Sequence, residues 1–277
     1  MYGGGKIGVV GGRTDVVIAG GIIGDETHAN ETGVFGGGEG HVGFEWAGST
    51  NSTNVTVTGN NPIIYGNIYG GGNLGPVGTL AIDQTRNRIS LSGGSANVTI
   101  SSGNIHGSVY GGGKGQYDEI ANNKLVLGAV QSTTVNILGG IIHEVTSSDN
   151  SKTKGNVYGG GELGLVGKLD LPNDAGTPNV EATNFTKGSA NVTISSGNIH
   201  GSVYGGGKGV DGATLEKYQD TPLVTIILGS VASTTHVEIS GGTIGTADDI
   251  TNKIYGGNVY GGGELGIVGN YQDSTVE

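Results

Sequence analysis

The chain has 277 residues, a formal net charge of −11 and no cysteine. The negative charge argues against nucleic acid and anionic membranes as partners, because both require a basic protein surface. The absence of thiols excludes disulfides, thiolate metal sites and cysteine nucleophiles, and no apolar run is long enough to cross a membrane. The 60 glycines and the 13% of charged residues both depart from the composition of an ordinary domain.

An aromatic residue followed by three glycines recurs along the whole chain, and such self-similarity is typical of repeat proteins. The aromatic residues are Tyr2, Phe35, Tyr69, Tyr110, Tyr158, Tyr204 and Tyr260. Residues 94–115 and 188–209 are identical and begin 94 residues apart, which is two repeats. The larger unit is therefore a pair of repeats, one ending GGGK and the other GGGE or GGGN.

Four short pieces follow one another in each repeat, beginning with a strand of alternating polar and apolar residues that a glycine turn closes. These first strands are predicted at 15–18, 54–57, 97–100, 134–137, 191–194 and 236–239. Short second strands are centred on Ile23, Ile64, Ile105, Ile142, Ile199 and Ile244. The third piece places an inward residue before the aromatic, at Val34, Ile68, Val109, Val157, Val203 and Val259. The fourth piece, LGxV or a variant, carries Val10, Val42, Val77, Val130, Val166, Val231 and Val268.

Strands separated by turns every 33 or more residues, without a sustained helical period, predict an all-β fold with few or no helices. We expect a single domain over 1–277, a parallel β-solenoid of about seven coils, most simply a right-handed β-helix. Equivalent valines and isoleucines would stack about 4.8 Å apart as ladders in a narrow core. The pair of coils would repeat as 94–187 and 188–277.

Strand alternation predicts that the aromatic after each inward residue points outward. The seven aromatics would then form an exposed ladder able to stack on sugar rings, and they are the candidate ligand-binding residues. The alternative is that the chain bends there and the rings cap the edge of the core or cover a neighbouring face. Two polar columns are also expected outward. One contains Asp15, Asn54, Asn97, Thr134, Asn191 and His236, and the other Val17, Thr56, Thr99, Asn136, Thr193 and Glu238.

The repeats differ mainly in inserted segments, which hold most of the Asp, Lys, Asn, Thr and Pro. These candidate loops are 79–93, 115–126, 144–154, 168–187, 209–226 and 245–253. Long surface loops on a rigid scaffold are a frequent home of binding function, and tolerated sequence drift is the alternative explanation for each.

The columns NVTISSGxI and GxVYGGG resemble the repeat stalks of secreted, adhesin-like bacterial or archaeal surface proteins with a pectate-lyase-like right-handed parallel β-helix. The resemblance implies a structural or adhesive segment of an extracellular protein, with host or microbial glycans or surface proteins as partners. The alternatives are a carbohydrate-active β-helix enzyme, either a lyase or a hydrolase, and a self-assembling fibre subunit.

Catalytic, cofactor and metal sites find little support in the sequence. The three arginines, Arg13, Arg86 and Arg88, lie outside the expected repeat strands, and Asp248-Asp249 lies in a loop, so we expect no enzyme. The GGGK segments lack the Ser or Thr and the helix of a phosphate-binding loop. His106, His143 and His200 share one repeat position, which explains the column more simply than a metal site. No cofactor is expected, and weak Ca²⁺ binding by acidic loops stays an alternative.

Both ends of the sequence fall inside a repeat. Val276-Glu277 matches Val237-Glu238 in the middle of a first strand, and Tyr2 begins inside a third piece. We expect a slice of a longer array, with signal and anchor outside it. The alternative is end-to-end association of open strands in a filament.

Overall fold

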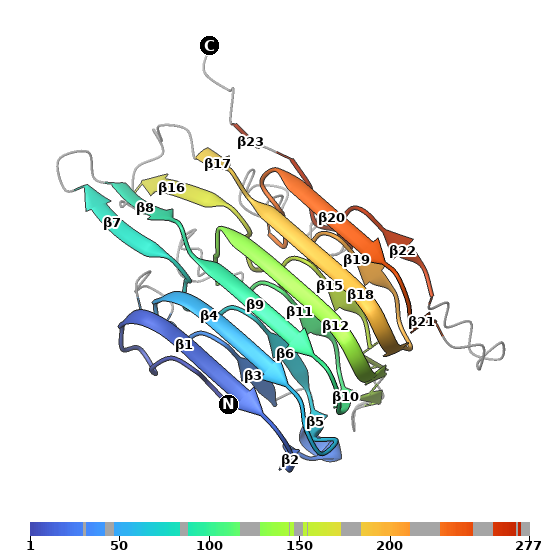
Figure 1. The fold of residues 1–277 in the computed structure, drawn as a ribbon. Coiled ribbons are helices and arrows are strands. Elements are labelled where there is room, and N and C mark those ends of the chain that lie inside the picture. The colour runs from blue at the N-terminus through green and yellow to red at the C-terminus, as the bar shows by residue number, and fades with distance from the viewer. Residues whose placement is uncertain are drawn as a thin grey trace.

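The computed structural model describes residues 1–29, 32–41, 47–83, 88–116, 128–143, 145–146, 152–153, 155–172, 184–210, 228–245, 257–269 and 271–272. The fold is all-β, and most of its strands lie in parallel sheets (Figure 1). The one helical turn within these ranges is the 3-10 turn η1, Glu26–His28. None of the described segments forms an apolar helix of membrane-spanning length.

The first sheet contains the predicted first and second strands of the repeats, and in β12 and β18 the two are one continuous strand without the predicted turn. Its long strands are β1 (Val10–Ile18), β4 (Thr50–Val57), β9 (Ser95–Ile100), β12 (Ser132–His143), β18 (Ser189–Ile199) and β20 (Thr234–Ile239). Its short strands are β2 (Ile22–Ile23), β5 (Ile63–Tyr65), β10 (Asn104–His106) and β21 (Thr243–Ile244). Each long strand pairs in parallel with the equivalent strand of the next repeat, so both outward columns have the expected register.

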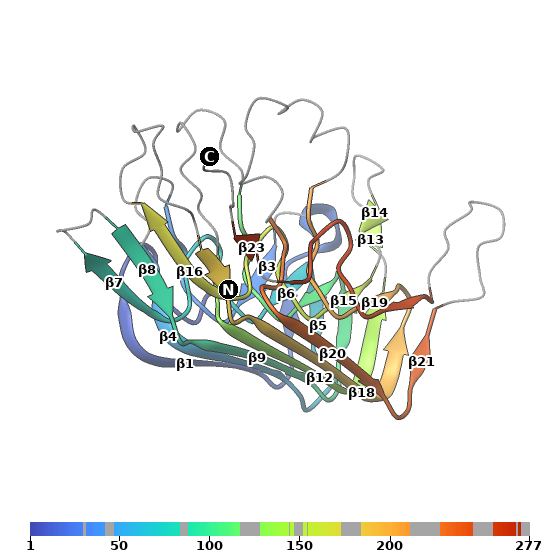
Figure 2. The same cartoon turned by 90° about the horizontal axis from the view of Figure 1, so that it is seen from above.

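A second parallel sheet contains the strand that ends at each aromatic. It consists of β3 (Gly33–Phe35), β6 (Asn67–Tyr69), β11 (Val109–Tyr110), β15 (Val157–Tyr158), β19 (Val203–Tyr204) and β22 (Val259–Tyr260). Figure 2 shows this sheet facing the curved first sheet across the interior. A ladder of single parallel bridges joins the fourth pieces at Val77, Val130, Val166, Val231 and Val268.

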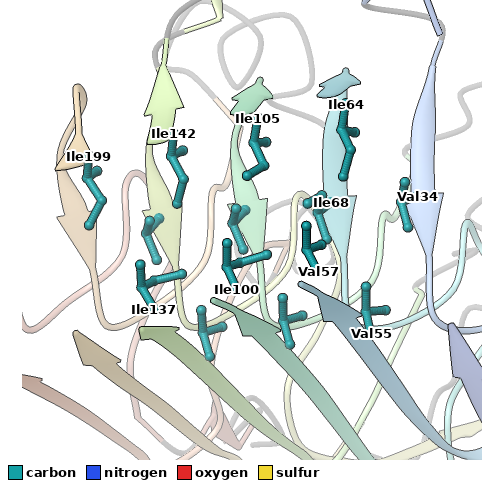
Figure 3. Close-up of a cluster of buried hydrophobic side chains, with 14 of the residues drawn as sticks. Val34, Val55, Val57, Ile64, Ile68, Ile100, Ile105, Ile137, Ile142 and Ile199 are labelled. Atoms are coloured by element: carbon teal, nitrogen blue, oxygen red, sulfur yellow. The ribbon is translucent and has the colours of Figure 1, made fainter. Parts of the chain in front are cut away.

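The core between these sheets is a set of aliphatic ladders, because every repeat places a valine or isoleucine at the same depth (Figure 3). Ile64, Ile105, Ile142 and Ile199 form one row and are fully buried. The inward residue before each aromatic also pairs with its equivalent in the next repeat, from Val34 to Val259. Burying each such side chain contributes about 1.5–3 kcal/mol, which fixes the register between repeats.

A third sheet corrects the expectation that the inserts are loops. It is antiparallel and contains β7 (Thr79–Asp83), β8 (Arg88–Ser92), β16 (Lys168–Pro172), β17 (Asn184–Thr186) and β23 (Tyr271–Gln272). The inserts 79–93 and 168–187 therefore pair with each other, with Leu169 opposite Leu91. The insert 144–154 holds a small antiparallel pair, β13 (Val145–Thr146) and β14 (Lys152–Thr153).

Arg13 corrects a second expectation, because it lies within β1 rather than outside the repeat strands. Its Nε donates to Asp15 Oδ2 at 2.9 Å on the exposed face of the sheet.

Several predictions fall outside the described residues: those for Val42, Arg86, Asp248-Asp249 and Val276-Glu277, and most of the inserts 115–126, 209–226 and 245–253.

Candidate functional site: the aromatic stack and its charged column

The seven aromatics form one continuous stack through the protein. Neighbouring ring centroids lie 4.6–5.0 Å apart, and their planes are 2–12° from parallel. This geometry follows from the second sheet, which sets equivalent residues of successive repeats one strand spacing apart. Stacked pairs contribute about 0.5–1.5 kcal/mol each beyond the area they bury. The stack therefore joins all seven repeats.

The burial of the rings contradicts the expectation of an exposed ladder. The rings do point away from the aliphatic core and form a separate cluster, as strand alternation requires. Phe35, Tyr69, Tyr110 and Tyr158 are nevertheless buried, with at most 6% of each residue exposed. Each ring covers the face of its neighbour, so internal ring faces are closed to a sugar. Only Tyr2 (39% exposed) and Tyr260 (44% exposed) leave one ring face uncovered by another ring of the stack.

The hydroxyls of Tyr69 and Tyr158 each belong to a hydrogen-bonded relay. Asn156 Nδ2 donates to the Tyr158 hydroxyl at 2.8 Å, and this hydroxyl donates to a carboxylate oxygen of Glu264. Asn67 Nδ2 and Glu162 hold Tyr69 in the same way. Each glutamate belongs to the second repeat after that of the tyrosine it binds. Burial, reinforced by the negative charge of the glutamate, raises the pKa of both phenols, so they stay protonated and donate.

The same asparagines also tie the repeats together through the backbone. Asn156 Oδ1 accepts from Ser202 N at 2.8 Å, and Ser108 Oγ accepts from Asn156 N at 3.1 Å. Asn67 Oδ1 accepts from Ser108 N at 2.8 Å. Asparagine and serine therefore alternate along a ladder beside the tyrosines, and each has its partner in the next repeat. Ser108, Asn156 and Ser202 are buried, and each finds a hydrogen-bond partner in an adjacent repeat of the other kind.

A column of charged residues follows the glycine triplets. In repeat order it contains Lys6, Glu39, Asn73, Lys114, Glu162, Lys208 and Glu264. Lys6 lies 3.5 Å from Glu39, and Lys208 lies 3.3 Å from Glu162. The charge alternates in sign except at Asn73, which is a neutral residue between Glu39 and Lys114. Opposite charges on neighbouring strands stabilise their pairing, and like charges destabilise it.

Two types of repeat emerge from these contacts. The Thr-Asn type has a threonine whose Oγ1 donates to the first glycine carbonyl of its own triplet, at 2.5–2.6 Å. It comprises the sets Thr53-Asn67-Asn73, Thr133-Asn156-Glu162 and Thr235-Asn258-Glu264. The Phe35 repeat shares the threonine bond, from Thr14 Oγ1 to Gly36 O at 2.6 Å, but has Gly33 in place of the asparagine. The Ala-Ser type comprises the sets Ala96-Ser108-Lys114 and Ala190-Ser202-Lys208. The 94-residue period is therefore one repeat of each type.

The glycine triplets are required by the closeness of the stacked backbones. Gly36, Gly70, Gly111, Gly159 and Gly205 begin internal triplets. A methyl group on any of them would lie within 3.0 Å of the carbonyl oxygen of the equivalent glycine in the next repeat. Gly111 N also donates to Tyr158 O at 2.9 Å, which holds the two backbones together. The triplet is a structural corner, as the sequence indicates.

The histidine column is a row of imidazoles that begins beside Tyr65, and neighbouring imidazole planes are tilted by 51–56°. The His106 and His143 ring centroids are 3.8 Å apart, and those of His143 and His200 are 5.6 Å apart. Burial and the two neighbouring imidazoles lower the pKa of His143 to about 4. Among the residues that the structure describes, no cluster of three or more His, Asp or Glu side chains is placed to hold a metal ion.

Sequence reasoning missed the residues that hold the stack, namely Asn67, Asn156, Glu162 and Glu264. Their signal is the alternation of GNVYGGGE with GSVYGGGK, which by itself indicates only that the repeats come in pairs. The hydrogen bond between Tyr69 and Glu162 joins side chains that lie two repeats apart. The repeat pattern of the sequence does not indicate contacts across that distance.

No protein-family model matches the chain, and comparisons with curated proteins and with solved structures give no match.

Proposed function

We propose that this chain is a rigid structural segment of an extracellular microbial surface protein, built as a right-handed β-solenoid of about seven coils. The observation that supports this most is the constancy of register. Equivalent side chains of successive repeats pair in the first strands, the second strands, the aromatic strands and the fourth pieces. A scaffold whose ladders all keep one register resists bending and stretching along its axis.

The side-chain networks add to this stiffness. The Tyr158 hydroxyl joins repeats that are two apart through Glu264, and Lys208 pairs with Glu162 of the preceding repeat. Bending the stack would separate the rings and leave the buried asparagine and serine groups unpaired. Six spacings of about 4.8 Å give an axial length of roughly 29 Å, which suits a spacer within a longer stalk.

Adhesion is assigned to the inserted segments rather than to the ring faces inside the stack. Inserts from different repeats gather in the antiparallel sheet of β7, β8, β16, β17 and β23, and a composite surface of this kind suits a glycan or a surface protein. Among the seven aromatics, Tyr2 and Tyr260 have a ring face suited to stacking on a sugar. Ca²⁺ bound weakly by acidic inserts would be an accessory, and no catalytic activity is proposed.

Immunostaining tests the proposed location. Antibodies raised against this chain should label intact cells of the source organism without permeabilisation, and labelling only after permeabilisation would refute a surface role. Hydrogen exchange tests stiffness, because amides of the central strands β9, β12 and β18 should all exchange slowly and together. Fast exchange in any one of these strands would contradict a continuous rigid scaffold.

A glycan array, read with the wild-type chain and with Tyr260→Ala, tests the adhesive part. Binding that survives the substitution would assign the contact to the inserts, and binding lost with it would assign the contact to the end of the stack. A reducing-end assay on the glycans that bind tests the enzyme alternative. Release of new ends would replace the structural proposal with a carbohydrate-active one.

A further inference from the structure

We propose that the outward face of the first sheet binds an uncharged polysaccharide whose straight chains are packed side by side. The residues concerned form two rows, which we call the polar array: Asn54, Asn97, Thr134 and Asn191 in one row, and Thr56, Thr99, Asn136 and Thr193 in the other. They belong to β4, β9, β12 and β18, each of which pairs with a described strand on both sides. The proposal uses other residues than the inserts and does not depend on the stalk role.

The polar array is regular because its four strands keep one register. Asn97 pairs with Asn54 and with Thr134, and Thr134 pairs with Asn191. Neighbours within a row are therefore one strand spacing apart, about 4.8 Å, and the rows are two residues, or about 6.7 Å, apart. Figure 1 shows the four strands lying side by side. Only a ligand that itself repeats can contact such a surface in the same way at every strand.

The hydrogen-bonding groups of the polar array are largely free. Its side chains alternate with buried valines and isoleucines, so they point away from the core. Asn54 Nδ2 lies 3.4 Å from Asp15 Oδ1 and from Thr56 Oγ1, and the other six side chains form no hydrogen bond within the part of the chain that the structure describes. The inward Thr133 and Asn156, by contrast, are paired. A sugar hydroxyl both donates and accepts, so free amides and hydroxyls suit it.

The lack of charge selects the class of polymer. The chain has 24 Asp and Glu residues and 13 Lys and Arg residues, but none of them stands in the polar array. An anionic polymer would find no basic partner there and would be repelled by the net charge of −11. A cationic polymer would bind the acidic residues elsewhere in preference. The array therefore suits an uncharged polymer.

The size of the polar array favours an ordered solid over a short soluble glycan. Four strands, with six residues along each, give a face of roughly 19 Å by 20 Å, or about 400 Å². A contact of this size is small, so measurable affinity requires several chains presented together. A coiled polymer would touch the face at separate points, whereas straight chains packed side by side would cover it. Straight β-linked polymers of glucose or of N-acetylglucosamine have this form.

Co-sedimentation of the 277-residue chain with particles of microcrystalline cellulose and of crystalline chitin tests the proposal. At least one of the two should deplete the wild type from solution, with a saturable isotherm. Binding should be equal at about 0.15 M and about 1 M salt, because neither partner contributes a charge to the contact. Particles of cross-linked polygalacturonate, which is anionic, should leave the protein in solution.

Two double substitutions test the polar array itself. Thr99→Glu with Thr193→Glu places two long charged side chains on either side of Asn136, which would hold a flat ligand off the face, and binding should weaken at least about tenfold. Thr99→Val with Thr193→Val keeps the shape and the strand preference but removes two hydroxyls, and binding should weaken about tenfold. This second pair decides the matter if circular dichroism shows that the glutamate pair does not fold.

Asn60→Glu with Thr243→Glu is the matched control, because it adds the same charge at exposed positions outside the polar array, in a turn and in β21. It should bind like the wild type. A wild type that both cellulose and chitin leave in solution overturns the proposal, and inhibition of ice recrystallisation by such a protein would assign the face to ordered water instead.

Folded valine variants that bind as tightly as the wild type, or a control that binds as weakly as the glutamate pair, would also overturn the proposal. The immunostaining and hydrogen-exchange tests of the structural role do not depend on these results. Failure of the polysaccharide contact is therefore distinguishable from failure of the structural role.

Discussion

Replacing Tyr110 by alanine tests whether the aromatic stack is a structural element. The Tyr110 ring lies between Tyr69 at 5.0 Å and Tyr158 at 4.6 Å, and the residue is 1% exposed. Truncating a buried aromatic costs about 3–5 kcal/mol, of which the two lost stacking contacts account for roughly 1–3 kcal/mol. Against a typical stability of about 5–15 kcal/mol, Tyr110→Ala should lower the urea midpoint strongly, as measured by circular dichroism.

Tyr260→Ala is the control for this measurement. Tyr260 has one ring neighbour, at 4.9 Å, and is 44% exposed. Its loss should cost about 1–2 kcal/mol, roughly half or less of the central value. If Tyr110→Ala were no more destabilising than Tyr260→Ala, the stack would contribute little to the fold, and the structural interpretation of the seven rings would be wrong.

Three further substitutions or conditions test the packing around the same repeat. Gly111→Ala should lower the free energy of unfolding by about 3 kcal/mol or more, because its methyl group would overlap the Gly159 carbonyl. Gly12→Ala, on the open face of β1, should be neutral or slightly stabilising. Thermal midpoints of the two variants compare the effects, and equal midpoints would refute the argument from close backbone packing. Thr133→Val should lower the free energy of unfolding by about 1 kcal/mol, since Thr133 Oγ1 donates to Gly159 O at 2.6 Å. A urea titration that finds no loss of stability would contradict a role for this hydrogen bond. The pKa of His143 is about 4 in the fold and near 6.5 in the unfolded chain. Because the unfolded chain binds the proton first as the pH falls, this contribution to the free energy of unfolding is full above about pH 6.5 and is lost as the pH drops towards about 4. His143→Gln should flatten this part of the pH profile of the thermal midpoint, and an unchanged profile would contradict the lowered pKa of His143.

The ladders of the first two strands could be predicted from the sequence because stacking reuses one side-chain position in every repeat. Val98 and Val135 are equivalent in the sequence, and the structure pairs them directly. The direction of the tyrosines could be predicted as well, since alternation points them away from the aliphatic core. Their burial could not, because it depends on the neighbouring rings and on side chains from other repeats.

The third sheet shows a different limit of sequence reasoning. The segments TLAID, RISLS and KLDLP alternate in polarity, as strands do, but they lie in inserts of different repeats with no shared repeat position. Nothing in the order of residues states that Leu169 will lie opposite Leu91. Pairing of this kind is set by where the scaffold brings the inserts together, so the three-dimensional stack must exist before the partner strands can be identified.

The alternation of Thr-Asn and Ala-Ser repeats constrains how a gene for such an array can change in length. Gain or loss of a single repeat would set Lys beside Lys or Glu beside Glu, and would leave an asparagine without its serine. Recombination between the identical segments 94–115 and 188–209 instead moves one repeat of each type and keeps every pairing. Viable length variants should therefore differ by about 94 residues and by about 9.6 Å of axial rise, with exceptions where a neutral residue such as Asn73 tolerates two like repeats in succession.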